Sequence, residues 1–532
     1  MPVSDPVPLV SSLSDIYSPA GVAKSALRWD RLASQFSKAF NQSQPDFIAR
    51  APGRVNLIGE HIDYVGFSVF PAAIEKDILM AVKVHRSDDD GHSAAEGELE
   101  VVIKNTTPRF EAHTFTSGYL ETDQVGLLDQ GDQRWANYFK VAFKGLHSHL
   151  PAEVLESRSR PTRIEVLVDG TIPPESSLSS SAAMTTCSSI VILQAFGARE
   201  RIDRTEMAEV AIESERLVGV NSGGMDQSAS IFSIPHHALY ISFYPKLSVQ
   251  PTRLPTSQPE HTFVIANTLV VSDKKVTGPV NYNLRVVETR MAARALAKAL
   301  GIESNRGEET KTLRLVLETF FREKPAALEE EGGAEVLDTL RGYGEEAARL
   351  RFMELASDRL LEKGGMTREQ VEVATGFRGK DFDQEFLSSF PIRAEKFKLH
   401  ARSVHVFSEA LRVIQFKSLC SEESKGPSTY ASLGELMSSS QASLRELYEC
   451  SCPELDELIQ LASDSGAIGS RLTGAGWGGC TVHLVRKSDV PEFLASLRRG
   501  YYEKRFPGLR EEEINDALFD TEPAGGACVY QV

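Results

Sequence analysis

The chain has 532 residues, a length that favours two or three domains. Hydrophobic residues make up 41% and charged residues 25%, which is ordinary for a globular protein with a sizeable core. The formal net charge of -16 argues against nucleic acid or an anionic membrane as the main partner, because both require a basic surface. A small anionic ligand in a local basic pocket remains compatible with this charge.

The six cysteines are too sparse for a disulfide framework, and Cys450 and Cys452 have the spacing of neither a redox motif nor a zinc motif. Reduced thiols and a cytoplasmic location are therefore expected. The first residues lack the basic and apolar segments of a signal peptide, and no apolar run reaches the length of a membrane span. We expect neither secretion nor membrane insertion.

The first part of the chain is predicted to form a loose N-terminal segment (the lead), a helix, a strand and a charged loop. Residues 1–17 are rich in proline and serine and are expected to be loose, so that 1–22 form an N-terminal lead. Ala23–Phe40 has the apolar spacing of an amphipathic helix. After a short strand at Phe47–Ala51, residues 51–64 read Ala-Pro-Gly-Arg-Val-Asn-Leu-Ile-Gly-Glu-His-Ile-Asp-Tyr and are predicted to form a loop.

This charged loop carries four polar side chains within a few residues, namely Arg54, Glu60, His61 and Asp63. Carboxylates and an imidazole can donate to and accept from several hydroxyls at once, which suits recognition of a polyhydroxylated ligand. A solvated surface turn is the alternative. The apolar residues among the charges, such as Leu57, indicate partial burial and disfavour that alternative.

The next part of the chain is predicted to continue as sheet. Residues 68–84 and 101–115 have strand patterns, and 87–97, which contain three consecutive aspartates, are expected to be a solvated loop. A helix is predicted to begin near Trp135. Trp135 and Tyr138 are an aromatic pair at spacing i, i+3, which is usual for core residues; stacking on an adenine ring is the more specific alternative.

The most informative stretch is Ser176–Ala183, which reads Ser-Ser-Leu-Ser-Ser-Ser-Ala-Ala. It follows a strand at 164–168 and a turn, and it precedes an apolar run, 182–196, long enough for a buried helix. Small hydroxyl side chains at the start of a helix leave backbone N–H groups accessible, which makes an anion site. An ordinary serine N-cap is the alternative.

A second glycine-rich turn follows a helix predicted at 205–218. Residues 219–227 read Gly-Val-Asn-Ser-Gly-Gly-Met-Asp-Gln, and they deliver one acid, Asp226, at the end of the turn. Asp226 is either a general base or a turn residue. His236 and His237 precede a strand and are read as structural. The proline-rich stretch 245–259 marks the predicted domain boundary, with one lobe over 23–258 and the other over 259–532.

The second lobe is predicted to begin with a strand at 261–271 and a helix at 281–300. Residues 301–460 are mostly helical and charged, with a helical insert at about 301–400, and they carry no catalytic signature. Ser470–Val485 contains a match to G-x-G-x-x-G, but a strand instead of a helix follows it, which excludes a dinucleotide fold. We expect a glycine-rich turn packed against something flat or anionic.

We interpret the chain as a phosphoryl transferase without a Walker loop. This interpretation combines three glycine- or serine-rich turns, the charged loop, and the aspartate that follows the glycines, Asp226. The combination resembles the GHMP small-molecule kinases and, within them, the galactokinase family, most closely its fungal members. Four segments carry the resemblance: residues 50–64, Leu178–Ala183, Gly223–Gln227 and Leu472–Gly479.

The resemblance implies an α+β fold of two lobes, with mixed sheets and helices and the active site between the lobes. It implies galactose and ATP as substrates and Mg²⁺ as cofactor. Asp226 matches the proposed catalytic base, and Arg54 beside it would favour the ionised carboxylate. The residues matching those around the hexose are Arg54, Glu60, His61, Asp63, Gly223, Asp226 and Tyr282. The nucleotide would be bound by Trp135, Tyr138, Ser177, Leu178, Ser179, Ser180, Ser181 and Ala182, and Mg²⁺ by Ser181 and Glu215.

The serine motif departs from the family pattern in one place. The family usually has glycine before the leucine of this motif, where this chain has Ser177, and Glu175 lies two residues earlier. If the loop requires a positive φ there, Ser177 is strained by on the order of 1 kcal/mol. Glu175 would add negative charge near the phosphates. Both residues would weaken ATP binding.

Three functions are compatible with these motifs. The first is ATP-dependent phosphorylation of the anomeric hydroxyl of galactose to galactose 1-phosphate. The second is an N-acetylgalactosamine kinase, because the motifs do not define the pocket around the 2-substituent. The third is a galactose- and ATP-sensing regulator that binds a transcriptional repressor, which would add a regulatory protein partner. Such regulators lack the Ser-Ala pair that this chain keeps at Ser181 and Ala182, so catalysis is favoured.

Overall fold

The structure is a computed structural model of the chain. It describes residues 5–86, 98–118, 125–127, 133–157, 159–218, 223–256, 258–270, 277–389, 391–421 and 427–532. The acidic loop predicted at 87–97 lies outside the described residues, as do the first four residues of the lead, the first residues of the turn at 219–227 and the end of the strand at 261–271.

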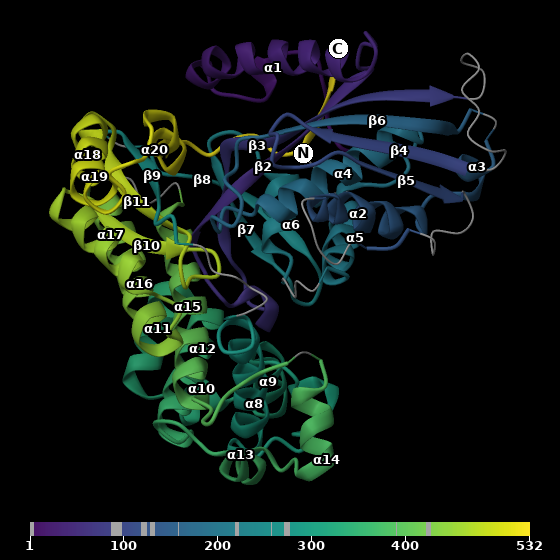
Figure 1. The fold of residues 1–532 in the computed structure, drawn as a ribbon. Coiled ribbons are helices and arrows are strands. Elements are labelled where there is room, and N and C mark those ends of the chain that lie inside the picture. Colours follow the sequence, from purple (N-terminus) through teal and green to yellow (C-terminus); the bar gives the residue numbers. More distant parts are fainter. Residues whose placement is uncertain are drawn as a thin grey trace.

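A seven-stranded sheet is the centre of the N-terminal half, in the order β1–β13–β2–β3–β6–β4–β5 (Figure 1). Neighbouring strands are antiparallel, except that β1 runs parallel to β13 and β4 runs parallel to β6. The strands are β1 (Leu9–Val10), β2 (Phe47–Ile58), β3 (Phe70–Arg86), β4 (Glu98–Asn105), β5 (His113–Gly118), β6 (Pro161–Gly170) and β13 (Cys528–Gln531).

Helices cover both faces of this sheet (Figure 1). On one face α1 packs against β3 and β6 through apolar side chains at helical spacing, among them Trp29, Leu32 and Phe36. On the other face α4 packs against β2 and β3, and it is buried on nearly all sides, as its apolar composition requires. These helices are α1 (Pro19–Ala39), α2 (Asn137–His147), α3 (Ala152–Leu155), α4 (Ser180–Ala195), α5 (Arg204–Arg216) and α6 (Met225–Phe232).

A four-stranded antiparallel sheet, in the order β10–β11–β9–β12, forms the second sheet. Its strands are β9 (His261–Asn267), β10 (Gly469–Thr473), β11 (Cys480–Arg486) and β12 (Leu518–Thr521), and β7 (His237–Ser242) and β8 (Ser248–Arg253) form a separate hairpin. The helices beside this sheet are α17 (Pro453–Asp464), α18 (Val490–Leu497), α19 (Glu503–Arg505) and α20 (Glu511–Ala517).

The remaining helices form the lower part of the molecule in Figure 1. They are α8 (Tyr282–Ala299), α9 (Leu313–Glu323), α10 (Ala327–Glu330), α11 (Gly333–Tyr343), α12 (Glu345–Leu360), α13 (Arg368–Thr375), α14 (Gly379–Phe382), α15 (Leu399–Leu419) and α16 (Pro427–Ser443). One apolar cluster runs from the large sheet into this helical part. Among the described residues, no helix has the length and apolar character needed to cross a bilayer.

Three segments differ from the sequence-based expectation. The lead is not loose over its described residues: β1 pairs with β13, and Val7, Ile16 and Tyr17 are buried. These apolar side chains have core partners that a local reading of the sequence does not reveal. The proline-rich stretch at 245–259, predicted to mark the domain boundary, contains a strand, β8, that the sequence did not predict.

The predicted loop at 51–64 is the third difference, because β2 continues through it to Ile58 and all 12 of its residues are buried. Its pairing with β3 is interrupted by irregularities between Pro52 and Arg54 and between Asn56 and Ile58. The proline and the glycine that suggested a loop therefore mark the first irregularity in a long central strand. Only residues 59–64 turn away from the sheet.

Candidate active site

The serine segment leads into α4 with an unusual backbone. Glu175, Ser177 and Ser179 have φ angles of 58°, 65° and 61°, in the left-handed region that is strained for residues other than glycine. The strain that the sequence predicted conditionally for Ser177 is therefore present. The Ser179 side chain does not cap α4, so the first N–H groups of this 16-residue helix face the loop without that cap. This arrangement suits an anion.

The glycine-rich turn between β10 and β11 packs directly on the serine segment. Gly474 and Gly479 have φ angles of 83° and 76°. A Cβ on Gly474 would lie 2.6 Å from the Ser177 Cβ, and a Cβ on Gly479 would lie 2.3 Å from the Ser177 Oγ. The turn is therefore packed against the side chain of Ser177, which explains why both positions require glycine.

Arg54 connects β2, the serine segment and α6. Its Nε and Nη2 lie 2.9 Å and 2.8 Å from Oδ1 of Asp226. Its Nη1 donates to the carbonyl of Ser177 at 2.6 Å. The Arg54 side chain is 4% exposed, whereas that of Asp226 is 24% exposed, so the acid remains accessible to a ligand. Asp226 also lies in the first turn of α6, where the helix dipole favours a carboxylate.

Asp63 lies beside Asp226. The N–H of Gly223 donates to Oδ2 of Asp63 at 3.1 Å, and a Cβ on Gly223 would lie 2.6 Å from the Asp63 Cγ. Burial, followed by the charge of Asp226, raises the pKa of Asp63 to about 6. The close approach of the two segments, and not an unusual φ, therefore requires glycine at position 223.

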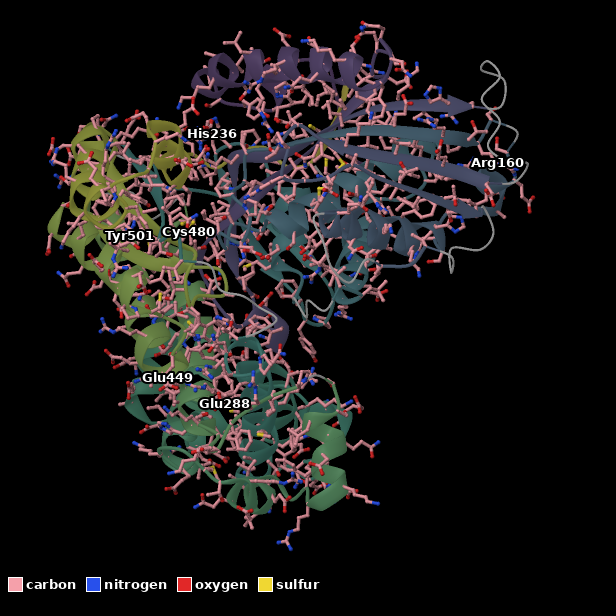
Figure 2. The ribbon with its side chains drawn as sticks, in the orientation of Figure 1. Arg160, His236, Glu288, Glu449, Cys480 and Tyr501 are labelled. Carbon is pink, nitrogen blue, oxygen red and sulfur yellow. The ribbon has the colours of Figure 1, made fainter. Side chains whose placement is uncertain are left out.

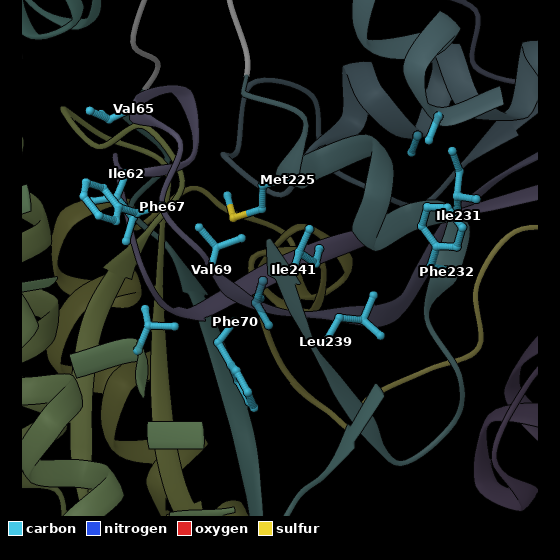
Figure 3. Packing of buried hydrophobic residues seen from close by; sticks show 14 of the residues in the cluster. Ile62, Val65, Phe67, Val69, Phe70, Met225, Ile231, Phe232, Leu239 and Ile241 are labelled. Carbon is cyan, nitrogen blue, oxygen red and sulfur yellow. The ribbon is translucent and has the colours of Figure 1, made fainter. Parts of the chain in front are cut away.

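The segments that carry these two acids share one apolar core. Ile62 and Val65 flank Asp63, Met225 precedes Asp226, and all three apolar side chains are buried. Figure 3 shows them in one cluster with residues of β3 and β7. Because interiors are close-packed, this core fixes the relative position of the two carboxylates.

Glu60 is held by bonds within the protein. Its Oε2 accepts a hydrogen bond from Nη2 of Arg471 at 2.7 Å, and its Oε1 accepts one from the N–H of Gly474 at 2.9 Å. Burial raises the pKa of Glu60 to about 7, and Arg471 opposes this shift. Glu60 thus links the charged segment, residues 51–64, to the glycine-rich turn.

His61 and Tyr282 belong to one group of contacting rings, in which His61 is buried and Tyr282 is half-buried. Nε2 of His61 lies 2.9 Å from the carbonyl of Ala475, and its Nδ1 lies 3.1 Å from the hydroxyl of Tyr64. Tyr282 begins α8, and its ring centroid lies 5.8 Å from His61 and 5.6 Å from Tyr64. Burial raises the pKa of Tyr282 well above its usual value, and the charges of Asp63 and Asp226 add to this. The structure therefore brings Tyr282 next to both acids.

Ser181 and Glu215 lie on helices that pack against each other. Ser181 is in the first turn of α4, and Glu215 is buried near the end of α5, where it accepts a hydrogen bond from Nε2 of Gln227. A hydroxyl and a carboxylate are hard oxygen ligands of the kind that Mg²⁺ accepts, so the residue types fit this metal. Over the described ranges, no group of three or more His, Cys, Asp or Glu side chains forms a metal site.

The aromatic pair predicted for adenine is divided between two environments. Trp135 packs on Phe110 at a centroid distance of 5.9 Å and donates from Nε1 to the carbonyl of Glu111 at 2.9 Å. Burial raises the pKa of Tyr138 to about 12, with contributions from the charges of Glu215 and Glu175. Tyr138 therefore lies near the serine segment, whereas Trp135 contacts Phe110 and Glu111.

Three parts of the chain match profiles of known families. Residues 34–84 match the galactokinase galactose-binding signature. Residues 137–233 match the GHMP kinases N terminal domain, and residues 417–503 match the GHMP kinases C terminal domain.

Curated relatives match nearly the whole chain. The galactokinase of Saccharomyces cerevisiae is 36% identical over 520 residues, which cover 94% of this chain and 94% of the relative. The chain belongs to the galactokinase family. Another member, the galactokinase of Candida parapsilosis, is 34% identical over 535 residues and covers 99% of this chain and 98% of its own length. That of Dictyostelium discoideum is 33% identical over 539 residues, with coverages of 98% and 97%.

A solved structure of the same family has the same fold. The crystal structure of Lactococcus lactis galactokinase complexed with galactose matches with a TM-score of 0.63 at 22% identity, over 95% of this chain and 100% of that chain. The prediction of an α+β GHMP kinase fold is thereby confirmed.

Two residues of this chain beside the site, Arg471 and Tyr448, were not singled out from the sequence. Arg471 binds Glu60, and its position just before the glycine-rich turn is a signal that could have been used. Tyr448 contacts Tyr64 from a helical stretch without any recognisable motif, so the sequence offered no signal for it.

Proposed function

We propose that the protein is an ATP-dependent galactokinase, which transfers the terminal phosphoryl group of ATP to the anomeric hydroxyl of galactose and forms galactose 1-phosphate. The observation that carries the proposal is the Arg54–Asp226 pair, in which an accessible carboxylate is held between Asp63 and the serine segment. The relatives named galactokinase and the match of residues 34–84 to a galactose-binding signature supply the identity of the sugar.

Asp226 is proposed to orient the anomeric hydroxyl and to accept its proton as the hydroxyl oxygen attacks the terminal phosphorus, with ADP as the leaving group. Arg54 holds Oδ1 of Asp226 with two nitrogens, which keeps the carboxylate in one orientation. Its positive charge would also stabilise negative charge on the transferring group. Positioning and charge stabilisation supply most of the catalysis in phosphoryl transfer.

The serine segment is proposed to bind the phosphates of ATP through the uncapped N–H groups at the start of α4. Residues 177–182 would line this site, and Tyr138, with Trp135 further away, would border the adenosine. Ser181 and Glu215 are the residues that would hold Mg²⁺, which neutralises phosphate charge when it is bound.

The sugar is proposed to lie against Asp63, Gly223 and Tyr282, with Asp226 at its reacting hydroxyl. Glu60 and His61 border this space, and their bonds to the glycine-rich turn keep them in place. A neutral sugar offers no charge for long-range attraction, so its affinity depends on such pre-organised polar groups.

Neither alternative function gains support from a specific observation. The relatives named above are all galactokinases, and neither N-acetylgalactosamine nor a repressor protein is mentioned in their names. A cytoplasmic location also remains part of the proposal, supported by six cysteines that are all free thiols.

The deciding experiment measures ADP release by the purified protein with ATP, Mg²⁺ and either galactose or N-acetylgalactosamine, and it identifies the phosphorylated product by NMR. We expect turnover with galactose and little with N-acetylgalactosamine. If turnover is faster with N-acetylgalactosamine, that sugar and not galactose is the substrate. Binding of galactose and ATP without any phosphoryl transfer would favour a sensor.

A further inference from the structure

A helical corner at residues 444–450 contacts the candidate site, although it contains no motif of the family resemblance. It follows α16 as a π-helical turn, Leu444–Tyr448, and ends at Glu449, whose φ of 56° reverses the chain direction. The side chain of Tyr448 is fully buried. Its ring centroid lies 4.7 Å from that of His61, which borders the proposed sugar site.

The hydrogen bonds between these side chains have a defined direction. Burial lowers the pKa of His61 to about 3, so its ring is neutral and carries one N–H. Nε2 of His61 faces the carbonyl of Ala475, which can only accept, so this nitrogen carries the proton. Nδ1 must then accept from the hydroxyl of Tyr64.

The Tyr64 hydroxyl therefore already donates its only proton to His61. Its oxygen lies 2.5 Å from the hydroxyl oxygen of Tyr448. Tyr448 must therefore be the donor of this bond. The result is a single chain of donors that runs from Tyr448 through Tyr64 and His61 to Ala475. Tyr448 and His61 are buried and Tyr64 is partly buried, so these groups are fully hydrogen-bonded to one another in only one arrangement of donors and acceptors.

The same corner also contacts the glycine-rich turn, which contains Ala475, the last acceptor in this chain of hydrogen bonds. The N–H of Trp477 donates to the carbonyl of Cys450 at 2.7 Å, and its Nε1 donates to the carbonyl of Glu449 at 3.1 Å. A Cβ on Gly476 would lie 2.1 Å from the Cys450 carbonyl oxygen. The corner therefore contacts the charged segment through a side chain and the glycine-rich turn through its backbone.

Buried ion pairs fix the corner itself. Nε of Arg285 donates to the carbonyl of Tyr448 at 2.6 Å, and Arg402 bonds Glu288 at 2.6 Å and Glu449 at 2.7 Å. Figure 2 shows Glu288 and Glu449 in the helical part of the molecule, on different elements. Arg285 is on α8, three residues after Tyr282, so the corner is also joined to the helix that supplies this site residue.

We propose that Tyr448 is a positioning residue for the sugar site: its hydroxyl donates to Tyr64 and so fixes His61, Asp63 and the glycine-rich turn in the arrangement that receives the sugar. The inference rests on the proposed function for the identity of that sugar. Tyr448 does not touch the reacting atoms and takes no part in proton transfer to Asp226. Its loss would therefore weaken sugar binding and leave the chemical step unchanged.

The test compares Tyr448→Phe with Tyr430→Phe. Both variants remove the hydroxyl of a buried tyrosine, but Tyr430 donates to the carbonyl of Pro255, away from the site. For Tyr448→Phe we expect the KM for galactose to rise about 3- to 10-fold, the range for loss of one buried hydrogen bond. The KM for ATP and kcat should stay within about twofold, and Tyr430→Phe should change none of these constants.

A second variant, Tyr64→Phe, and the double variant complete a cycle. Because Tyr64 and Tyr448 share one hydrogen bond, their effects on galactose affinity should not add, and calorimetry without ATP measures this affinity directly. If Tyr448→Phe folds poorly, Tyr64→Phe alone decides the matter, because it removes the same hydrogen bond and should weaken galactose binding in the same way. An unchanged galactose affinity, additive effects, or an equal rise in both KM values would each overturn the proposal. Absence of turnover by the unmodified protein would instead contradict the proposed function.

Discussion

The two segments that meet at Arg54 are stabilised in opposite ways. The serine segment has three residues with left-handed φ, and within the described part of the chain Ser179 Oγ has no hydrogen-bond partner. The charged segment is more completely hydrogen-bonded: Glu60 and Asp63 accept from backbone N–H groups, and both nitrogens of His61 are bonded. Within the described residues, its one buried polar side chain without a hydrogen-bond partner is that of Asn56. The serine segment therefore has three strained backbone positions, whereas the charged segment has one such non-glycine residue, His61, at a φ of 63°.

The difference reflects the ligands that the two sides are proposed to bind. Phosphates are highly charged and can themselves satisfy exposed N–H groups, so a strained loop is completed by its ligand. A neutral sugar contributes weaker individual interactions, so its site must be arranged before it binds. The variants below separate these two sides.

The largest effect is expected for Asp226→Asn, which keeps the size of the side chain and removes its capacity to accept a proton. We expect kcat to fall by about 10²- to 10⁴-fold, the usual range for a lost general base. Galactose affinity, measured by calorimetry, should change only a few-fold. Asp516→Asn, at an exposed position, is the control. Loss of galactose binding together with activity would assign Asp226 to folding of the site.

The second effect concerns the contact between the glycine-rich turn and the serine segment. In Gly479→Ala the new Cβ would overlap the side chain of Ser177, so we expect the KM for ATP to rise about tenfold or more. Galactose affinity should change much less. Gly508→Ala, where a Cβ meets no atom within 4 Å, is the control. Adding Ser177→Gly should restore part of the loss, and no restoration would contradict the proposed overlap.

The third effect is a pH dependence on the sugar side. Asp63 has a pKa of about 6 and must be ionised to accept fully from Gly223 and a sugar hydroxyl. Activity measured as kcat/KM for galactose should therefore fall as the pH drops through 6, by about tenfold per pH unit below it. His61 is not the cause, because its pKa lies near 3, whereas Glu60, with a pKa of about 7, would add a separate inflection at higher pH. Asp63→Asn should lower activity and remove this inflection; an unchanged profile would exclude Asp63 as its origin.

The smallest effect is expected for Ser177→Gly. Glycine adopts a φ of 65° without strain, so this variant should be up to about 1 kcal/mol more stable and melt at a slightly higher temperature. The KM for ATP should fall by a few-fold at most. Ser177→Ala keeps the strain and removes only the hydroxyl, which makes it the matched control. Equal stabilisation by both variants would show that the hydroxyl, and not the backbone, is the source.

Local patterns predicted much of the fold and of the site. The apolar run at 182–196 predicted the buried helix α4. What could not be predicted depends on partners distant in the sequence. Residues 5–17 appear loose until β13 lies beside them, and Ala51–Ile58 resembles a loop until β3 pairs with it. Tyr448 has no local signal because its role exists only through Tyr64, 384 positions away.

The position of β13 has a consequence for synthesis of the chain. This strand, Cys528–Gln531, lies between β1 and β2, although the other strands of the sheet all come from the first 170 residues. During translation the sheet therefore cannot be completed, and one edge of β2 remains unpaired, until nearly the whole chain has been synthesised. Unpaired edges invite pairing with other chains, so the incomplete sheet is exposed to such pairing until its last strand is available.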